Sequence, residues 1–155
     1  VLKREGDAAL RLQAALALAQ AGENAGLAIL TGALDECATR EALCKAIVTT
    51  LGKLRDPAAV PVLLSHLADV RTRLESVNAL GEIGDPAAVP ALIERLKTDE
   101  YVPVRIAAAQ GLARMGGARA LLALQWSAEN DPEPRVVEAV RAAIERVRQP
   151  PAKSP

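Results

Sequence analysis

The chain has 155 residues, half of them hydrophobic, with one Trp, one Tyr and no Phe. This almost wholly aliphatic composition favours closely packed helices, since Ala, Leu, Arg and Glu are strong helix formers. Nineteen basic residues balance nineteen acidic ones, which argues against a nucleic-acid binder, because phosphate neutralisation calls for a basic excess. No apolar run approaches the roughly 18 residues of a membrane span, and no secretory signal is visible.

The chain begins inside the first of several repeated units. Leu2 precedes Leu10 by the same interval as Leu96 precedes Val104. Residues 1–3 therefore match the last turn of a leading helix whose earlier turns are missing. We expect the natural protein to extend further toward its N-terminus, and the alternative is that the chain has been processed. The trailing helix of this unit matches the trailing-helix pattern of helical spacing, at Leu10, Gln13, Ala14, Ala17, Leu18 and Ala21.

Cys37 and Cys44 follow in the second unit. If both lie in one helix, their Cα atoms are roughly 10 Å apart at 1.5 Å per residue, which is too far for a disulfide. We therefore expect two reduced cysteines, as is typical of a cytoplasmic protein.

The repeat is clearest in the middle of the chain, where residues 56–61 (DPAAVP) recur as residues 85–90. Two independent series share the same spacing, which makes chance a poor explanation. One series comprises Leu18, Leu51, Leu80, Leu112 and Ile144, and the other comprises Leu27, Val60, Val89 and Leu121.

Each unit is predicted to contain two helices. The leading helix of the fourth unit begins at Asp85, whose carboxylate is a natural N-cap, and has its apolar positions at i, i+3, i+4 and i+7 from Val89. Pro90 lies further in and is expected to bend the helix, because it removes one helical hydrogen bond. The trailing helix is predicted from about Pro103 to Met115.

Residues 80–92 (LGEIGDPAAVPAL) and the Val104-Arg105 opening of a trailing helix resemble the HEAT family, and within it the HEAT-like repeat of phycobilisome lyases. The resemblance implies an all-α, right-handed α-solenoid of about five stacked helix pairs over residues 1–148. It also implies that the trailing helices line the concave side. Residues 149–155 are rich in proline and predict a disordered tail.

The trailing helices carry apolar residues opposite their core positions, where solvated helices are normally polar. This strip predicts a binding groove for a helical or apolar segment of a partner protein. The alternative is that neighbouring trailing helices cover it. The predicted groove residues are Leu12, Val48, Leu74, Val77, Ile106 and Ala109. The fifth trailing helix is charged there instead, which suits a rim or a cap.

Arginines flank this strip at one repeated position, namely Arg11, Arg73 and Arg105, where the second and fifth units have Cys44 and Val137. They either brace adjacent units by pairing with turn acids such as Asp69 and Asp99, or form a row of cations for carboxylates or phosphates. Trp126, on a leading helix, is either an exposed interaction hot spot or packed against a neighbouring helix, the last one in the chain.

The chemistry for catalysis is sparse. His66, the sole histidine, aligns with Arg95 on an outer helix face, and two cysteines with one histidine are too few for a zinc site. No catalytic residue, metal or cofactor is predicted. The sequence indicates a cytoplasmic, non-catalytic scaffold that binds another protein on its concave face. The alternative, implied by the resemblance, is a bilin lyase-type subunit that handles a tetrapyrrole chromophore and a phycobiliprotein.

Overall fold

The computed structural model describes residues 10, 13–15, 17–18, 24–37 and 40–149. Within these residues every regular element is a helix, and none of these helices is long and apolar enough to cross a bilayer. The predicted chain opening at residues 1–3 lies outside the described residues, as does the predicted tail beyond Gln149.

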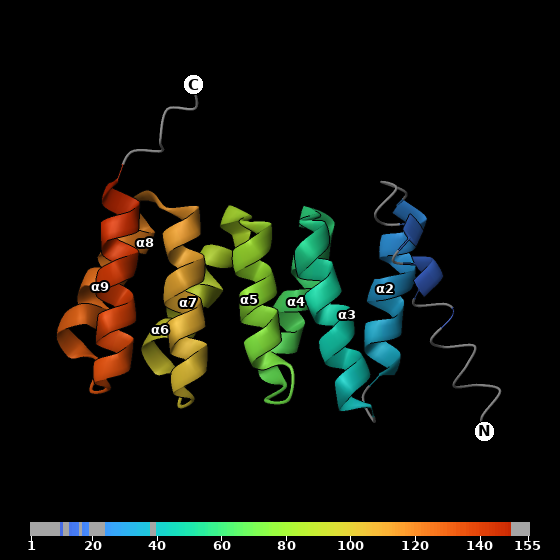
Figure 1. Cartoon of the computed structure of the whole chain (residues 1–155), viewed down its shortest axis with the longest axis horizontal. Helices are drawn as coiled ribbons and strands as arrows, with labels where there is room; N and C mark the ends of the chain where they lie inside the picture. The colour runs from blue at the N-terminus through green and yellow to red at the C-terminus, as the bar shows by residue number, and fades with distance from the viewer. Residues whose placement is uncertain (1–9, 11–12, 16, 19–23, 38–39, 150–155) are drawn as a thin grey trace.

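The helices alternate along the chain between two layers (Figure 1). The leading layer contains α2 (Asn24–Glu36), α4 (Val60–Ser65), α6 (Val89–Thr98) and α8 (Gly117–Asn130). The trailing layer contains α3 (Glu41–Leu54), α5 (Arg73–Ile83), α7 (Val102–Met115) and α9 (Pro134–Arg148). In Figure 1 the four trailing helices stand side by side, with α4, α6 and α8 behind them. This arrangement is the predicted α-solenoid.

A 3₁₀ turn precedes two of the leading helices. Because of this turn, the expectation that Pro90 bends its helix is wrong. The side chain of Asp85 accepts a hydrogen bond from the backbone N–H of Ala87 at 2.8 Å, and the 3₁₀ turn η3 (Pro86–Ala88) precedes α6. Pro90 therefore lies in the first turn of the α-helix, where its missing N–H costs no helical hydrogen bond. The turn η1 (Pro57–Ala59) precedes α4 in the same way, and η2 (His66–Ala68) follows that helix.

The core lies between the two layers and is aliphatic. The middle members of the first sequence series point into it: Leu51, Leu80 and Leu112 are completely buried. From the leading layer they meet Leu63, Leu92 and Leu124, which are equally buried. Each leucine contributes about 1.5–3 kcal/mol when it leaves water, so the stacked layers are stable without aromatic residues.

Adjacent trailing helices approach one another closely, because small residues face each other between them. A Cβ atom built on Gly52 of α3 would lie 2.7 Å from the Cα atom of Ala79 in α5. A Cβ atom on Gly81 of α5 would lie 2.8 Å from the Cα atom of Gly111 in α7. Real Cβ atoms essentially never come so close, so glycine is what allows this spacing of the trailing layer.

Candidate functional site

The predicted apolar groove is closed over most of its length. Val48, Val77 and Ala109 are fully buried, so the expectation of an exposed strip is wrong at these positions, and the alternative of coverage by neighbouring helices is correct. Val48 and Val77 each lie one helical turn before a glycine that touches the next trailing helix, and residues four apart share a helix face. The close spacing of the trailing helices therefore buries both. Leu12 lies outside the described residues.

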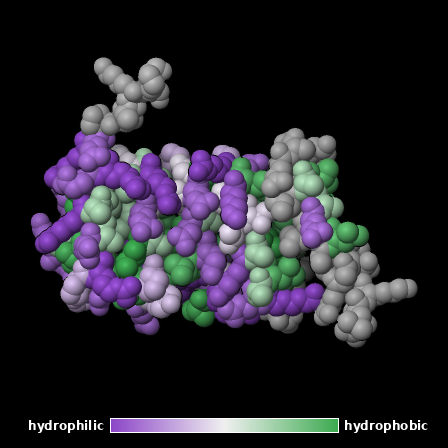
Figure 2. Space-filling view, viewed as in Figure 1, coloured by the Kyte–Doolittle hydropathy of each residue, from purple (hydrophilic) through white to green (hydrophobic). Residues whose placement is uncertain are grey.

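Leu74 and Ile106 are half-buried and remain part of the accessible surface. They occupy equivalent places on α5 and α7, and both pack against the core on one side. One turn further along each helix stands an exposed polar side chain: Asn78 on α5 and Gln110 on α7. We call the surface over α3, α5, α7 and α9 that contains these residues the trailing-helix face. In Figure 2 this face is largely hydrophilic, with separate hydrophobic patches.

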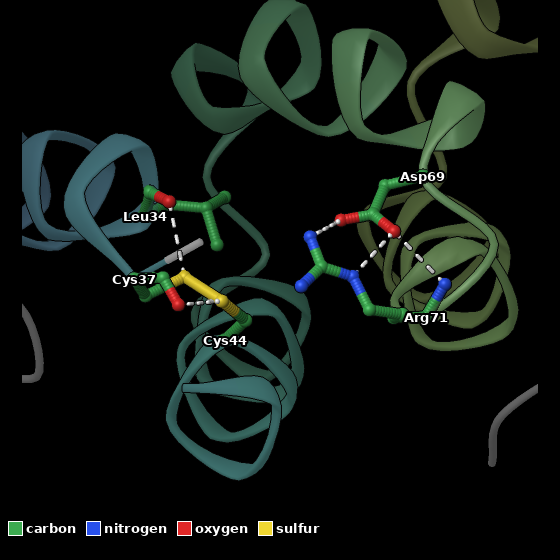
Figure 3. Close-up of a disulfide and its surroundings, with 5 residues drawn as sticks. All are labelled: Leu34, Cys37, Cys44, Asp69 and Arg71. Atoms are coloured by element: carbon green, nitrogen blue, oxygen red, sulfur yellow. Dashed lines mark hydrogen bonds and ion pairs between the residues drawn. A yellow bond between two sulfur atoms is a disulfide. The ribbon is translucent and has the colours of Figure 1, made fainter. Parts of the chain in front are cut away.

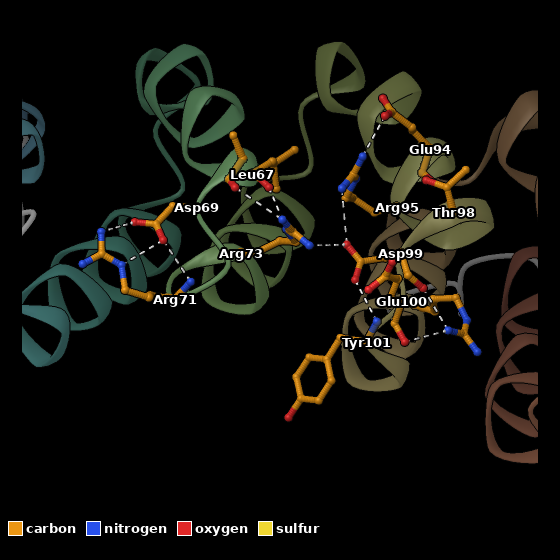
Figure 4. A network of polar contacts seen from close by, with 12 residues as sticks. Leu67, Asp69, Arg71, Arg73, Glu94, Arg95, Thr98, Asp99, Glu100 and Tyr101 are labelled. Carbon is orange, nitrogen blue, oxygen red and sulfur yellow. Dashed lines mark hydrogen bonds and ion pairs between the residues drawn. The ribbon is translucent and has the colours of Figure 1, made fainter.

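Arg73 braces two adjacent repeats. Its Nε and Nη2 atoms donate to the backbone carbonyls of Leu67 and Ala68 at 2.8 and 3.3 Å, at the end of its own leading segment. Its Nη1 atom donates to Asp99 in the next repeat at 3.3 Å, as Figure 4 shows. The carboxylate of Asp99 is completely buried and also accepts from Arg95 at 3.3 Å.

Arg105 repeats this arrangement one unit later. Its Nη1 atom donates to the carbonyl of Asp99 at 2.9 Å, while Nε and Nη2 hold both carboxylate oxygens of Asp131 at 2.8 and 3.0 Å. Bidentate pairs of this kind combine charge with fixed geometry. The donors of Arg73 and Arg105 are thus directed at internal partners, which favours the bracing interpretation over a row of ligand-binding cations. Arg11 lies outside the described residues.

The corresponding junction nearer the N-terminus is built differently (Figure 3). Cys44 occupies the arginine position and forms a disulfide with Cys37, with 5.4 Å between their Cα atoms. The expectation of reduced cysteines is wrong, because α2 ends at Glu36 and α3 begins at Glu41, so the two residues do not share one helix. The disulfide removes the argument from which a cytoplasmic location was inferred, and that location stays a prediction.

Asp69, the other turn acid expected to pair with the arginine row, is bound within its own loop. Arg71 donates to it through Nε at 3.0 Å and Nη2 at 2.8 Å. The Arg71 side chain and backbone hydrogen bonds lower the pKa of Asp69 to about 2. The predicted bracing through Asp99 is therefore confirmed, whereas Asp69 bonds to a residue of its own turn.

Trp126 lies on the outer side of the leading layer and is 43% exposed. The ammonium of Lys97 in α6 stands 4.8 Å from the centroid of its ring, so the indole packs beside α6, while packing against the last helix stays a prediction. Leu122, one turn earlier on α8, is also exposed. Cation–π contacts at such exposed sites contribute about 0.5–1 kcal/mol. The Trp126 side chain thus contacts Lys97 and remains partly accessible to solvent.

The described residues offer little chemistry for a reaction. His66 is half-buried, contrary to the expected solvated position, and its Nδ1 atom is buried without a partner. Among the residues that the structure describes, no group of three His, Cys, Asp or Glu side chains is placed to hold a metal ion. A surface hollow of about 390 Å³ opens at the start of α9, lined by Asp131, Pro132, Pro134, Val137, Glu138 and Arg141. Its aspartate is already engaged by Arg105.

Comparison with known proteins agrees with this geometry. A family model described as HEAT repeats matches residues 1–73 and 68–145. No curated protein matches the chain. The match does not distinguish repeats of the phycobilisome-lyase type, so that part of the sequence interpretation stays a prediction.

Proposed function

Because the chain belongs to the HEAT-repeat family, we propose that it is a non-catalytic scaffold that binds a segment of another protein across the trailing-helix face. HEAT repeats are a protein-interaction type of fold, and solenoids bind through the extended surface that their stacking creates. The proposal concerns which part of that surface is used and what kind of segment it accepts.

The observation that carries the proposal is the mixed surface on α5 and α7. Leu74 and Ile106 offer apolar contact, while Asn78 and Gln110 are exposed and make no hydrogen bond with the residues that the structure describes. Amide side chains supply both donors and acceptors, and interfaces combine an apolar centre with a polar rim. A surface of this composition suits an amphipathic segment better than a wholly apolar one.

The spacing of the helices suits a partner helix laid across them. Packed helices lie about 8–10 Å apart, and residues seven apart in an α-helix are separated by about 10.5 Å along its axis. Apolar residues at i and i+7 of the partner would therefore meet Leu74 and Ile106 in turn. Polar residues beside them would meet Asn78 and Gln110.

The test is site-specific photo-crosslinking, followed by affinity measurement on the captured protein. A photoreactive residue at Gln110 is expected to capture a partner that the same residue at Leu122, on the exposed leading side, does not. The double variant Asn78→Glu/Gln110→Glu is then expected to weaken that complex by tenfold or more, because it places unpaired carboxylates in the interface. The matched control is Leu122→Glu, with unchanged affinity. Equal affinity for both variants would move the site away from the trailing-helix face.

A further inference from the structure

We propose that the Cys37–Cys44 disulfide is a redox-sensitive link between α2 and α3, which replaces the arginine contacts used in later repeats. Oxidised, it fastens the start of α3 to the end of α2. Reduced, it lets α2 open locally while the repeats from α5 onward stay closed. The inference does not depend on the proposed binding function.

The side chains at positions 44, 73 and 105 make equivalent contacts. Arg73 bonds to the carbonyls of Leu67 and Ala68, six and five residues earlier. Arg105 bonds to the carbonyls of the residues six and five before it in the same way. The Sγ atom of Cys44 lies 2.9 Å from the carbonyl oxygen of Cys37. In each repeat this side chain therefore joins the beginning of the trailing helix to the end of its leading segment.

Cysteine cannot make the second contact of these arginines, which is the one with the next repeat. Arg73 and Arg105 also reach an aspartate of the next repeat. Cys44 is too short for this, and Asp69 is bound by Arg71 instead. The ion pair from Lys45 of α3 to Glu75 of α5 spans 3.7 Å between partly exposed side chains, and pairs of this kind contribute little. Cys44 is thus tied to the end of its leading segment by a covalent bond, whereas Arg73 and Arg105 also reach the next repeat.

A dithiol reductant transfers two electrons and two protons to the disulfide, which breaks the S–S bond and leaves two cysteine thiols, while the reductant becomes a disulfide. Carbonyl acceptors for both thiols are already in place: the Sγ atom of Cys37 lies 3.0 Å from the oxygen of Leu34, and that of Cys44 faces the oxygen of Cys37. Reduction therefore exchanges a covalent link for weak S–H hydrogen bonds without leaving an unpaired buried group.

Burial of both sulfur atoms limits the access of a reductant. Cys37 and Cys44 are only 2% and 3% exposed, so a reductant reaches them when this region opens. Local openings of this kind have their own free energies, below that of global unfolding. The rate of reduction is expected to level off at high dithiothreitol concentration, because opening then becomes the slow step.

Hydrogen exchange of the 155-residue chain, measured by mass spectrometry with and without dithiothreitol, tests the proposal. Reduction is expected to accelerate exchange of α2 amides about tenfold or more, as the loss of a short-loop crosslink predicts, and to leave α7 unchanged. The variant Cys37→Ser/Cys44→Ser should exchange quickly in both conditions. The variant Cys37→Ser/Cys44→Arg supplies a guanidinium that can bind the carbonyls at the end of its leading segment, and it should exchange slowly in both.

Two outcomes would overturn the proposal. One is that the disulfide does not form. In that case, protein that was purified without reductant, exposed to a disulfide oxidant and then denatured still has two thiols that can be alkylated. The other is identical α2 exchange in the oxidised and reduced chains, when thiol alkylation shows that reduction was complete. The serine variant separates the loss of the crosslink from any effect of dithiothreitol elsewhere.

Discussion

Between α7 and α9, Arg105 holds both carboxylate oxygens of a nearly buried Asp131, whereas between α3 and α5 the same position is Cys44, which is bound to Cys37 in a disulfide. The loop aspartate has a role in both regions: Asp69 and Asp131 each accept a backbone N–H two residues later. The cation that binds the aspartate differs: Arg71 of the same turn binds Asp69, whereas Arg105 of the preceding repeat binds Asp131. The comparison teaches that the turn is encoded within each repeat, while the connection to the next repeat depends on one side chain.

The largest expected effect comes from removing Arg105, the more buried of the two bracing arginines. Arg105→Ala is expected to lower the free energy of unfolding by about 3–5 kcal/mol, because it leaves the Asp131 carboxylate buried without its cation. Arg73→Ala should cost less, because Asp99 retains Arg95. Urea denaturation measures both, with Arg141→Ala, an exposed arginine of α9, as the control. Equal stability of Arg105→Ala and the control would mean that the bridge is not what closes this junction.

The glycine contacts are what the two regions share. Gly81→Val is expected to destabilise the chain by about 1–3 kcal/mol, as overpacking does, because the new Cβ atom would meet the backbone of Gly111. Gly52→Val should behave alike, since its Cβ atom would meet the backbone of Ala79. Thermal melting against Gly32→Ala, where no atom lies within 4 Å of the new Cβ, checks this. A tolerated Gly52→Val beside a disruptive Gly81→Val would show that the helix spacing differs between the regions as well.

A smaller effect is expected at Asp69, with a definite dependence on pH. Its pKa in the folded chain is about 2, below the ordinary value of 3.8. The carboxylate therefore contributes stability above about pH 4, and this contribution is lost as the pH falls from about 4 toward 2. Because the pair with Arg71 is partly exposed, the contribution is at most about 1 kcal/mol. Asp69→Asn should thus lower the urea midpoint slightly at pH 7 and by less near pH 2. An undiminished difference at pH 2 would point to the Asn side chain and not to the ion pair.

Several features of the fold could be predicted because they depend on neighbouring residues. Asp56 and Asp85 precede proline and cap the following turn, as their local sequence indicates. The helix pairs follow from apolar spacing. Arg73 and Asp99 occupy repeated positions and have opposite charges, so their pairing across the junction could be predicted from the sequence. The exposed amides Asn78 and Gln110 were missed, although their equivalent positions on successive trailing helices were a usable signal.

The sequence by itself determined the repeat, its two helices and the arginine position that braces them, since each rests on spacing within about 30 residues. Tertiary structure decided whether the apolar strip was open, because Val77 is covered only when Gly81 lets α7 come close. It also decided the state of the cysteines, because the distance from Cys37 to Cys44 depends on where α2 stops and the chain reverses. Both outcomes depend on distances between elements, which the spacing of residues along one helix does not contain.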